Sequence, residues 1–75
     1  MKDGNLTAAI EIFGFNTKEF PDSPYSWASL SEAQEKHGDH TNALTSTNKA
    51  LSLAKEGDYG YEQLVERQKR LSTNH

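Results

Sequence analysis

The sequence contains no cysteine, and this absence excludes disulfide bridges and thiolate metal sites. Proline occurs only at Pro21 and Pro24, so long helices can form in the rest of the chain. No apolar run approaches the roughly 20 residues of a membrane-spanning helix, and the net charge of −3 is mild. We therefore expect neither a membrane nor nucleic acid as a partner. The 75 residues suffice for one small domain.

Apolar residues recur at helical spacing in four segments. The pattern predicts an all-α domain with antiparallel helices at residues 6–19, 24–37, 40–54 and 59–72. Asn5, Ser23 and Asp39 are predicted N-caps, with Pro24 at the first position of the second helix. Gly38 is predicted to end that helix, as glycine often does.

The same spacing predicts which side chains form the core. We expect Trp27 to be a buried residue of the second helix, beside Leu30, Ser31 and Gln34. The expected inner face of the third helix is Ala43, Leu44, Thr47, Ala50, Leu51 and Ala54. The fourth helix is expected to bury Tyr61, Leu64, Val65 and Leu71.

An internal repeat is visible when the chain is shifted by 34 residues. The shift places Gly4 on Gly38, Ala9-Ile10 on Ala43-Leu44, Trp27 on Tyr61 and Leu30 on Leu64. With Trp27-x-x-Leu30-Ser31, Ala9-x-x-x-Phe13 and Pro21, the chain resembles the tetratricopeptide repeat family over nearly its whole length. Gln34, Thr47 and Lys55 depart from the family's usual residues.

This resemblance implies a fragment of a right-handed α-solenoid, built of helix–turn–helix repeats, as a single domain over residues 1–75. Residues 4–21 would be the second helix of a partial repeat, residues 22–55 a complete repeat, and residues 56–75 a capping helix. The phase also suggests a fragment, or the C-terminal part, of a larger bacterial protein.

The resemblance also implies a function, because tetratricopeptide arrays hold an extended or helical peptide on their concave face. On that basis we expect a non-catalytic protein-interaction module whose partner is a protein or peptide. By repeat position, the peptide-binding face would comprise Tyr25, Ser29, Glu32, Lys36, Tyr59, Glu62, Gln63, Glu66 and Arg70. The family's carboxylate clamp for chaperone tails is not expected, since Glu32 and Tyr59 stand where it needs Asn and Lys.

A narrower resemblance covers about half the chain. The stretches Ala9–Asn16, Phe20–Ser23 and Trp27–Ala33 are similar to repeats appended to bacterial serine hydrolases of the β-lactamase and penicillin-binding type. The alternative interpretation is therefore a structural C-terminal extension that packs on such a catalytic domain, or a dimerisation surface.

Candidate catalytic and metal-binding residues are few. His37 and His40 flank Gly38-Asp39, but a metal would need a third ligand, and a polar turn capped by Asp39 explains them better. No serine lies in a nucleophile elbow or a Ser-x-x-Lys motif. The basic run Arg67–Arg70 fits the end of a helix, where cations complement the helix dipole. We expect no catalytic residue, metal or cofactor.

The first predicted helix carries more apolar residues than one neighbouring helix can cover. We expect an exposed apolar patch near Ile12, Phe15 and the ridge formed by Ile10 and Phe13. Such a patch would pack against an upstream domain or cause weak self-association.

Overall fold

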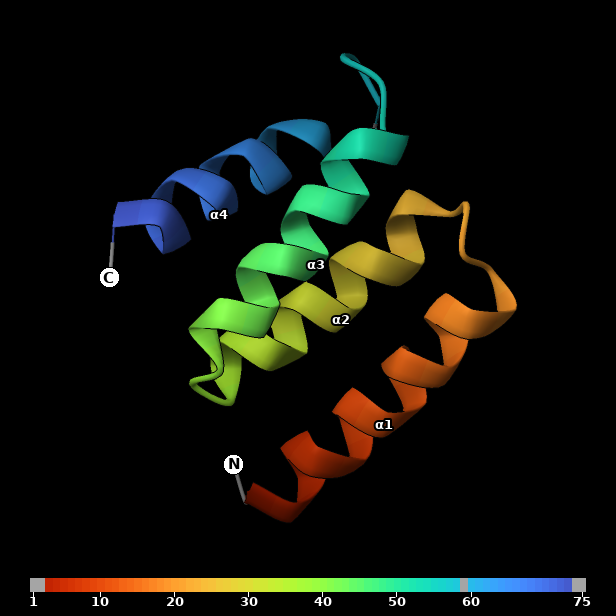
Figure 1. Cartoon of the computed structure of the whole chain (residues 1–75), viewed down its shortest axis with the longest axis vertical. Coiled ribbons are helices and arrows are strands. Elements are labelled where there is room, and N and C mark those ends of the chain that lie inside the picture. The colour runs from red at the N-terminus through yellow and green to blue at the C-terminus, as the bar shows by residue number, and fades with distance from the viewer. Residues whose placement is uncertain (1–2, 59, 74–75) are drawn as a thin grey trace.

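The computed structural model describes residues 3–58 and 60–73, and the regular structure in these ranges is entirely α-helical (Figure 1). The helices are α1 (Asp3–Glu19), α2 (Pro24–Lys36), α3 (His40–Leu53) and α4 (Tyr61–Thr73). The prediction of an all-α fold with four helices is confirmed.

The predicted N-caps are only partly correct. Helix α1 begins at Asp3, so Asn5 lies inside the helix, and its prediction as the N-cap is wrong. Gly4 does not stop the helix, because a glycine costs only about 1 kcal/mol relative to alanine. Ser23 does occupy the N-cap position of α2, with extended backbone before Pro24, but its side chain makes no capping hydrogen bond.

The turn between α2 and α3 follows the prediction closely. Gly38 adopts a φ of 91°, which an L side chain rarely tolerates. Its N–H donates to the Glu35 carbonyl at 3.0 Å, and the Asp39 N–H donates to the Gln34 carbonyl at 2.9 Å. These two bonds form a Schellman motif. The Asp39 carboxylate then caps α3 by accepting from the backbone and side-chain nitrogens of Asn42, at 3.4 and 2.7 Å.

The helices pack mainly on their neighbours in sequence. Helix α1 lies on α2, α2 on α3, and α3 on α4, so α1 and α4 occupy the two outer edges (Figure 1). The backbone measures 34 × 30 × 17 Å along its principal axes. This flat arrangement leaves one long side of α1 and one of α4 without a neighbouring helix in the described part of the chain.

The core of the described residues is made of small side chains. Its apolar members are Leu30, Ala33, Ala43, Ala50, Leu64 and Leu71, and its hydroxyl members are Thr17, Ser31, Ser46 and Thr47. Leu30, Ser31, Ala43, Thr47, Ala50, Leu64 and Leu71 are buried as predicted, whereas Gln34, Leu44, Leu51, Ala54, Tyr61 and Val65 are only half-buried. Small residues at these positions allow the helices to approach closely.

Each buried hydroxyl has a hydrogen-bond partner, as a buried polar group requires. Thr47 donates to the Ala43 carbonyl one turn earlier at 2.8 Å. Ser46, which the sequence pattern did not assign to the core, donates to the side-chain oxygen of Gln34 at 2.7 Å and so joins α3 to α2.

Trp27 is only partly buried, so the prediction of a buried core residue is wrong. It lies in the first turn of α2, beside the loop that follows α1. The indole N–H donates to the Pro21 carbonyl at 2.9 Å, and the Lys49 ammonium lies 5.9 Å from the ring centroid. Trp27 therefore binds the α1–α2 loop through this hydrogen bond and covers the edge of the core rather than filling its centre.

Candidate functional site

A groove of about 140 Å³ lies between α2 and the start of α4. Its α2 wall is formed by Tyr25, Ala28, Ser29 and Glu32, which share one helix face because of their spacing of three and four residues. Its α4 wall is formed by Gln63, Leu64 and Arg67. The groove thus combines an exposed aromatic ring, a small apolar floor and several side chains that can donate or accept hydrogen bonds.

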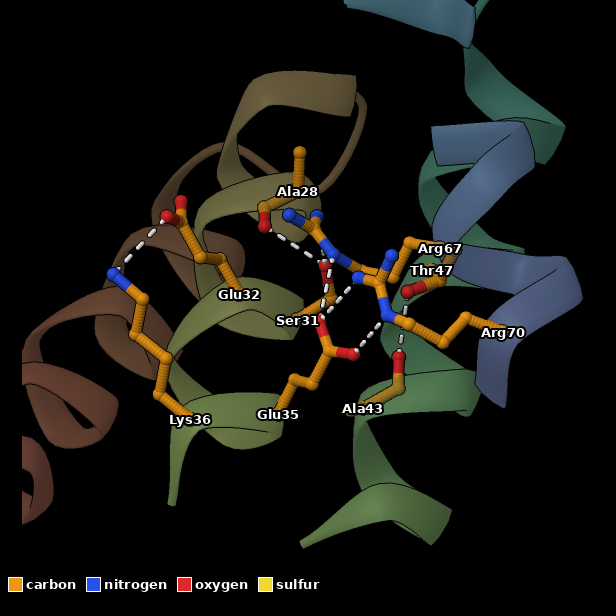
Figure 2. A network of polar contacts seen from close by, with 9 residues as sticks. All are labelled: Ala28, Ser31, Glu32, Glu35, Lys36, Ala43, Thr47, Arg67 and Arg70. Atoms are coloured by element: carbon orange, nitrogen blue, oxygen red, sulfur yellow. Dashed lines mark hydrogen bonds and ion pairs between the residues drawn. The ribbon is translucent and has the colours of Figure 1, made fainter. Parts of the chain in front are cut away.

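An ion-pair network links the two walls beside the groove (Figure 2). From α4, Arg70 donates from Nε to Glu35 Oε2 at 2.7 Å and from Nη2 to Oε1 at 2.8 Å. Arg67 donates from Nε to Glu35 Oε1 at 3.3 Å and from Nη1 to the Ser31 hydroxyl at 3.1 Å. Ser31 in turn donates to the Ala28 carbonyl at 2.8 Å. The network fixes the distance between α2 and α4.

The two arginines lower the pKa of Glu35. Hydrogen bonds from Arg70 are the main cause that lowers the pKa of the Glu35 carboxyl below its ordinary value, and the positive charges of Arg70 and Arg67 add to this effect against the opposing effect of burial. The same hydrogen bonds raise the pKa of Arg70. Glu35 is therefore ionised at neutral pH and holds both cations.

The structure brings together four of the residues predicted to bind a peptide. Tyr25, Ser29, Glu32 and Gln63 all line the groove between α2 and α4. Tyr25 is 57% exposed, so its ring is available for contact. Arg70 lies beside them, but its guanidinium is engaged with Glu35.

The other predicted residues lie elsewhere or cannot be placed. Lys36 pairs with Glu32 at 3.4 Å and points away from α4 (Figure 2). It lines a neighbouring hollow between α1 and α2, which shares Ser29 and Glu32 with the groove. Glu62 and Glu66 line another hollow, with the loop before α4. Tyr59 lies outside the described residues.

Arg67 is one of the groove residues that the sequence pattern did not place there, together with Pro24, Ala54, Asp58, Gly60 and Leu64. The sequence reading assigned Arg67 to a basic run at the end of a helix, whereas the structure turns it toward Ser31 and Glu35 of α2. A signal was present in the repeat. In the predicted repeat, residues 34 apart would lie on equivalent helices, and Glu35 precedes Arg67 and Arg70 by 32 and 35 residues.

The two histidines of the α2–α3 turn are both exposed. Among the described residues, no group of three His, Cys, Asp or Glu side chains lies close enough together to hold a metal ion. The Glu32 carboxylate pairs with Lys36, and Glu35 is held by two arginines. The side chains of the groove are thus arranged for contact and hydrogen bonding.

The outer side of α1 is a second surface of interest. Ile12 and Phe15 are 61% and 60% exposed, which confirms the predicted apolar patch at these two residues. Ile10 and Phe13 are half-buried, so the prediction that their ridge belongs to the patch is wrong. Phe13 lines the hollow between α1 and α2, because it lies on the side of α1 that packs against α2.

No helix in the described ranges is long and apolar enough to cross a bilayer. Comparisons of the chain with protein-family models, with curated protein sequences and with solved structures give no match.

Proposed function

We propose that this chain is a non-catalytic, tetratricopeptide-like module that binds a peptide segment of a partner protein in the groove between α2 and α4. The observation that carries the proposal is the convergence of Tyr25, Ser29, Glu32 and Gln63 on one open groove. Tyrosine with an exposed ring and a polar tip is a common contact residue at protein interfaces. The 34-residue repeat supports the same conclusion, because the paired walls then belong to equivalent helices.

The charges of the groove define the kind of peptide that fits. Glu32 and Asp58 both line it, whereas Arg67, the one cation among the described lining residues, is engaged by Glu35. An acidic segment would be repelled by these carboxylates, whereas a cation of the peptide could compete with Lys36 for Glu32, because that ion pair is exposed. We therefore expect the bound peptide to carry apolar side chains for Tyr25 and Ala28 and at least one Lys or Arg side chain for Glu32.

A displayed library of random peptides, selected against the chain and counter-selected against Tyr25→Ala, tests this proposal. The library should yield peptides that bind the parent chain at least tenfold more tightly than Tyr25→Ala. Phe15→Ala is the matched control, because Phe15 is equally exposed but lies on α1. The selected peptides should bind this control as they bind the parent.

Two outcomes would contradict the proposal. One is a selection that yields no peptide sensitive to Tyr25. The other is a set of peptides whose binding depends on Phe15 instead. Enrichment of Asp and Glu in the selected peptides would contradict the charge argument alone.

The alternative function, a structural extension that packs on a catalytic domain of the serine-hydrolase type, would use a different surface. The exposed Ile12 and Phe15 of α1 favour it. Binding of a separately expressed hydrolase domain that is lost in Phe15→Ala, and kept in Tyr25→Ala, would support this alternative over the peptide-binding module.

A further inference from the structure

The exposed side chains of α1 recur at regular helical intervals. Ala8, Ile12, Phe15 and Glu19 are all exposed and recur at intervals of four, three and four residues, so they form one stripe along the helix. The residues that follow Ala8, Ile12 and Phe15, namely Ala9, Phe13 and Asn16, are half-buried against the rest of the fold. The stripe is therefore the outward edge of a helix that is packed on its other side.

Two opposite charges flank this stripe on one side. Glu11 and Lys18 are both exposed, and neither makes an ion pair with another residue in the described part of the chain. They are seven residues apart, about 10 Å along the helix axis at 1.5 Å per residue, too far to pair with each other. Each charge is thus available to a partner.

We propose that α1 pairs antiparallel with α1 of a second copy of this chain, about a two-fold axis between Ile12 and Phe15. Ile12 of one copy then packs on Phe15 of the other, and the same contact is repeated across the axis. In this register Lys18 lies beside Glu11 of the second copy, with an axial offset of about 3 Å, which long side chains can span. Two reciprocal ion pairs therefore border two reciprocal apolar contacts.

The charges are the reason to prefer a second copy over another occupant. The proposed two-fold axis reverses the order of the stripe in the second copy. Ile12 of one copy therefore meets Phe15 of the other, and Ala8 meets Glu19. The same operation brings Glu11 toward Lys18, its opposite in charge, rather than toward itself. Parallel pairing would instead place Glu11 and Lys18 of the two copies on opposite sides of the contact, where they form no ion pair across it. The stripe is thus complementary to its own copy in one orientation only.

This surface is separate from the groove. The groove is lined by residues of α2, α4 and the loop between α3 and α4, and none of its lining residues belongs to α1. The pairing of α1 helices therefore neither requires nor blocks peptide binding, and the two proposals can fail independently. The contact area is small, so we expect a weak dimer.

Charge reversal tests the orientation directly. In sedimentation equilibrium at low ionic strength, the parent chain should dimerise with increasing concentration. Glu11→Lys and Lys18→Glu each turn two attractive pairs into two repulsive ones. Because an exposed ion pair contributes roughly 0.2–1 kcal/mol, each change should raise the dimer dissociation constant about tenfold. The double variant Glu11→Lys/Lys18→Glu restores both pairs and should return the constant to within about twofold of the parent value.

A pair of phenylalanine variants tests the apolar contact. Phe15→Ser should weaken the dimer at least tenfold, whereas Phe20→Ser, which alters an equally exposed ring outside the stripe, should not. Circular dichroism checks that each variant keeps the parent's helix content, as expected for exposed positions.

A parent chain that stays monomeric at millimolar concentration would overturn the proposal. So would single reversals without effect, a double variant that remains as weak as the singles, or a dimer that Phe20→Ser disrupts more than Phe15→Ser.

Discussion

Individual residues in this protein often serve a different purpose from the one their type suggests. Tryptophan usually fills a core, yet Trp27 is half-buried and donates its indole N–H to Pro21 in the preceding loop. Serine and threonine are usually exposed, yet Ser31 and Thr47 are fully buried. Each buried hydroxyl has a hydrogen-bond partner, which removes the cost of leaving it unpaired.

The position of Trp27 leads to a prediction about stability. Trp27→Ala should lower the free energy of unfolding by roughly 2–3 kcal/mol, since the residue is only partly buried and the rest of its surface stays in contact with water. Full burial of the ring would instead predict a cost of about 3–5 kcal/mol. Urea unfolding followed by circular dichroism measures the difference.

Trp27→Phe is the informative companion variant. It keeps an aromatic ring under Lys49 but loses the hydrogen bond to Pro21. It should therefore cost only about 1 kcal/mol, the usual net value of one hydrogen bond. A cost above about 4 kcal/mol for Trp27→Ala would mean that the ring lies in the centre of the core after all.

At the scale of helices, the sequence predicted the helix boundaries well and the side-chain contacts between helices less well. Helices α2 and α3 were predicted to within one residue, because Pro24, Gly38 and Asp39 mark their ends by local chemistry. The network of Glu35 with Arg67 and Arg70 was not predicted, since it depends on how α4 lies beside α2. The same limit explains the groove. The face of α2 could be predicted from spacing, but the choice of α4 residues that meet it could not.

The Glu35 network predicts how acid affects the attachment of α4. The pKa of Glu35 is lower in the folded protein than in the unfolded chain. The network therefore stabilises the fold above the unfolded-state pKa of about 4.3, and this stabilisation is lost as the pH falls through the lower folded-state pKa. Stability should therefore decline below about pH 4.3. In Glu35→Gln that decline should be smaller, and the stability at neutral pH should be lower.

Thermal melts of both proteins between pH 7 and pH 2.5 provide the measurement. Glu32→Gln is the matched control, because Glu32 makes a single exposed ion pair within α2. Parallel curves for the parent chain and Glu35→Gln would show that the network does not contribute to the acid response.

The unequal packing of α1 and α3 predicts unequal protection of their amides. Helix α3 packs against both α2 and α4, whereas α1 packs mainly against α2. Local opening of α1 should therefore require less free energy than opening of α3. In a dilute, monomeric sample, hydrogen exchange should be faster throughout residues 6–19 than in residues 43–50. Equal protection in the two helices would show that α1 needs no further support.

At the scale of the whole molecule, the chain exposes more surface to solvent than a compact protein of the same mass. The accessible surface is 5069 Å², whereas a compact protein of this mass exposes about 4,600 Å². The excess agrees with a flat row of helices in which each packs mainly on its neighbours in sequence. The groove and the outer side of α1 lie in different parts of this row. The two proposed contacts, with a peptide and with a second copy, would therefore not exclude each other.

The buried hydroxyls also affect how stability varies with temperature. Four of the ten buried side chains in the described part of the chain are serine or threonine, and three of the apolar six are alanine. Exposure of apolar surface raises the heat capacity on unfolding, whereas exposure of polar surface lowers it. The heat-capacity change should thus fall below the average of about 12–15 cal/mol/K per residue. A small change flattens the stability curve, so this protein should lose stability gradually on both heating and cooling.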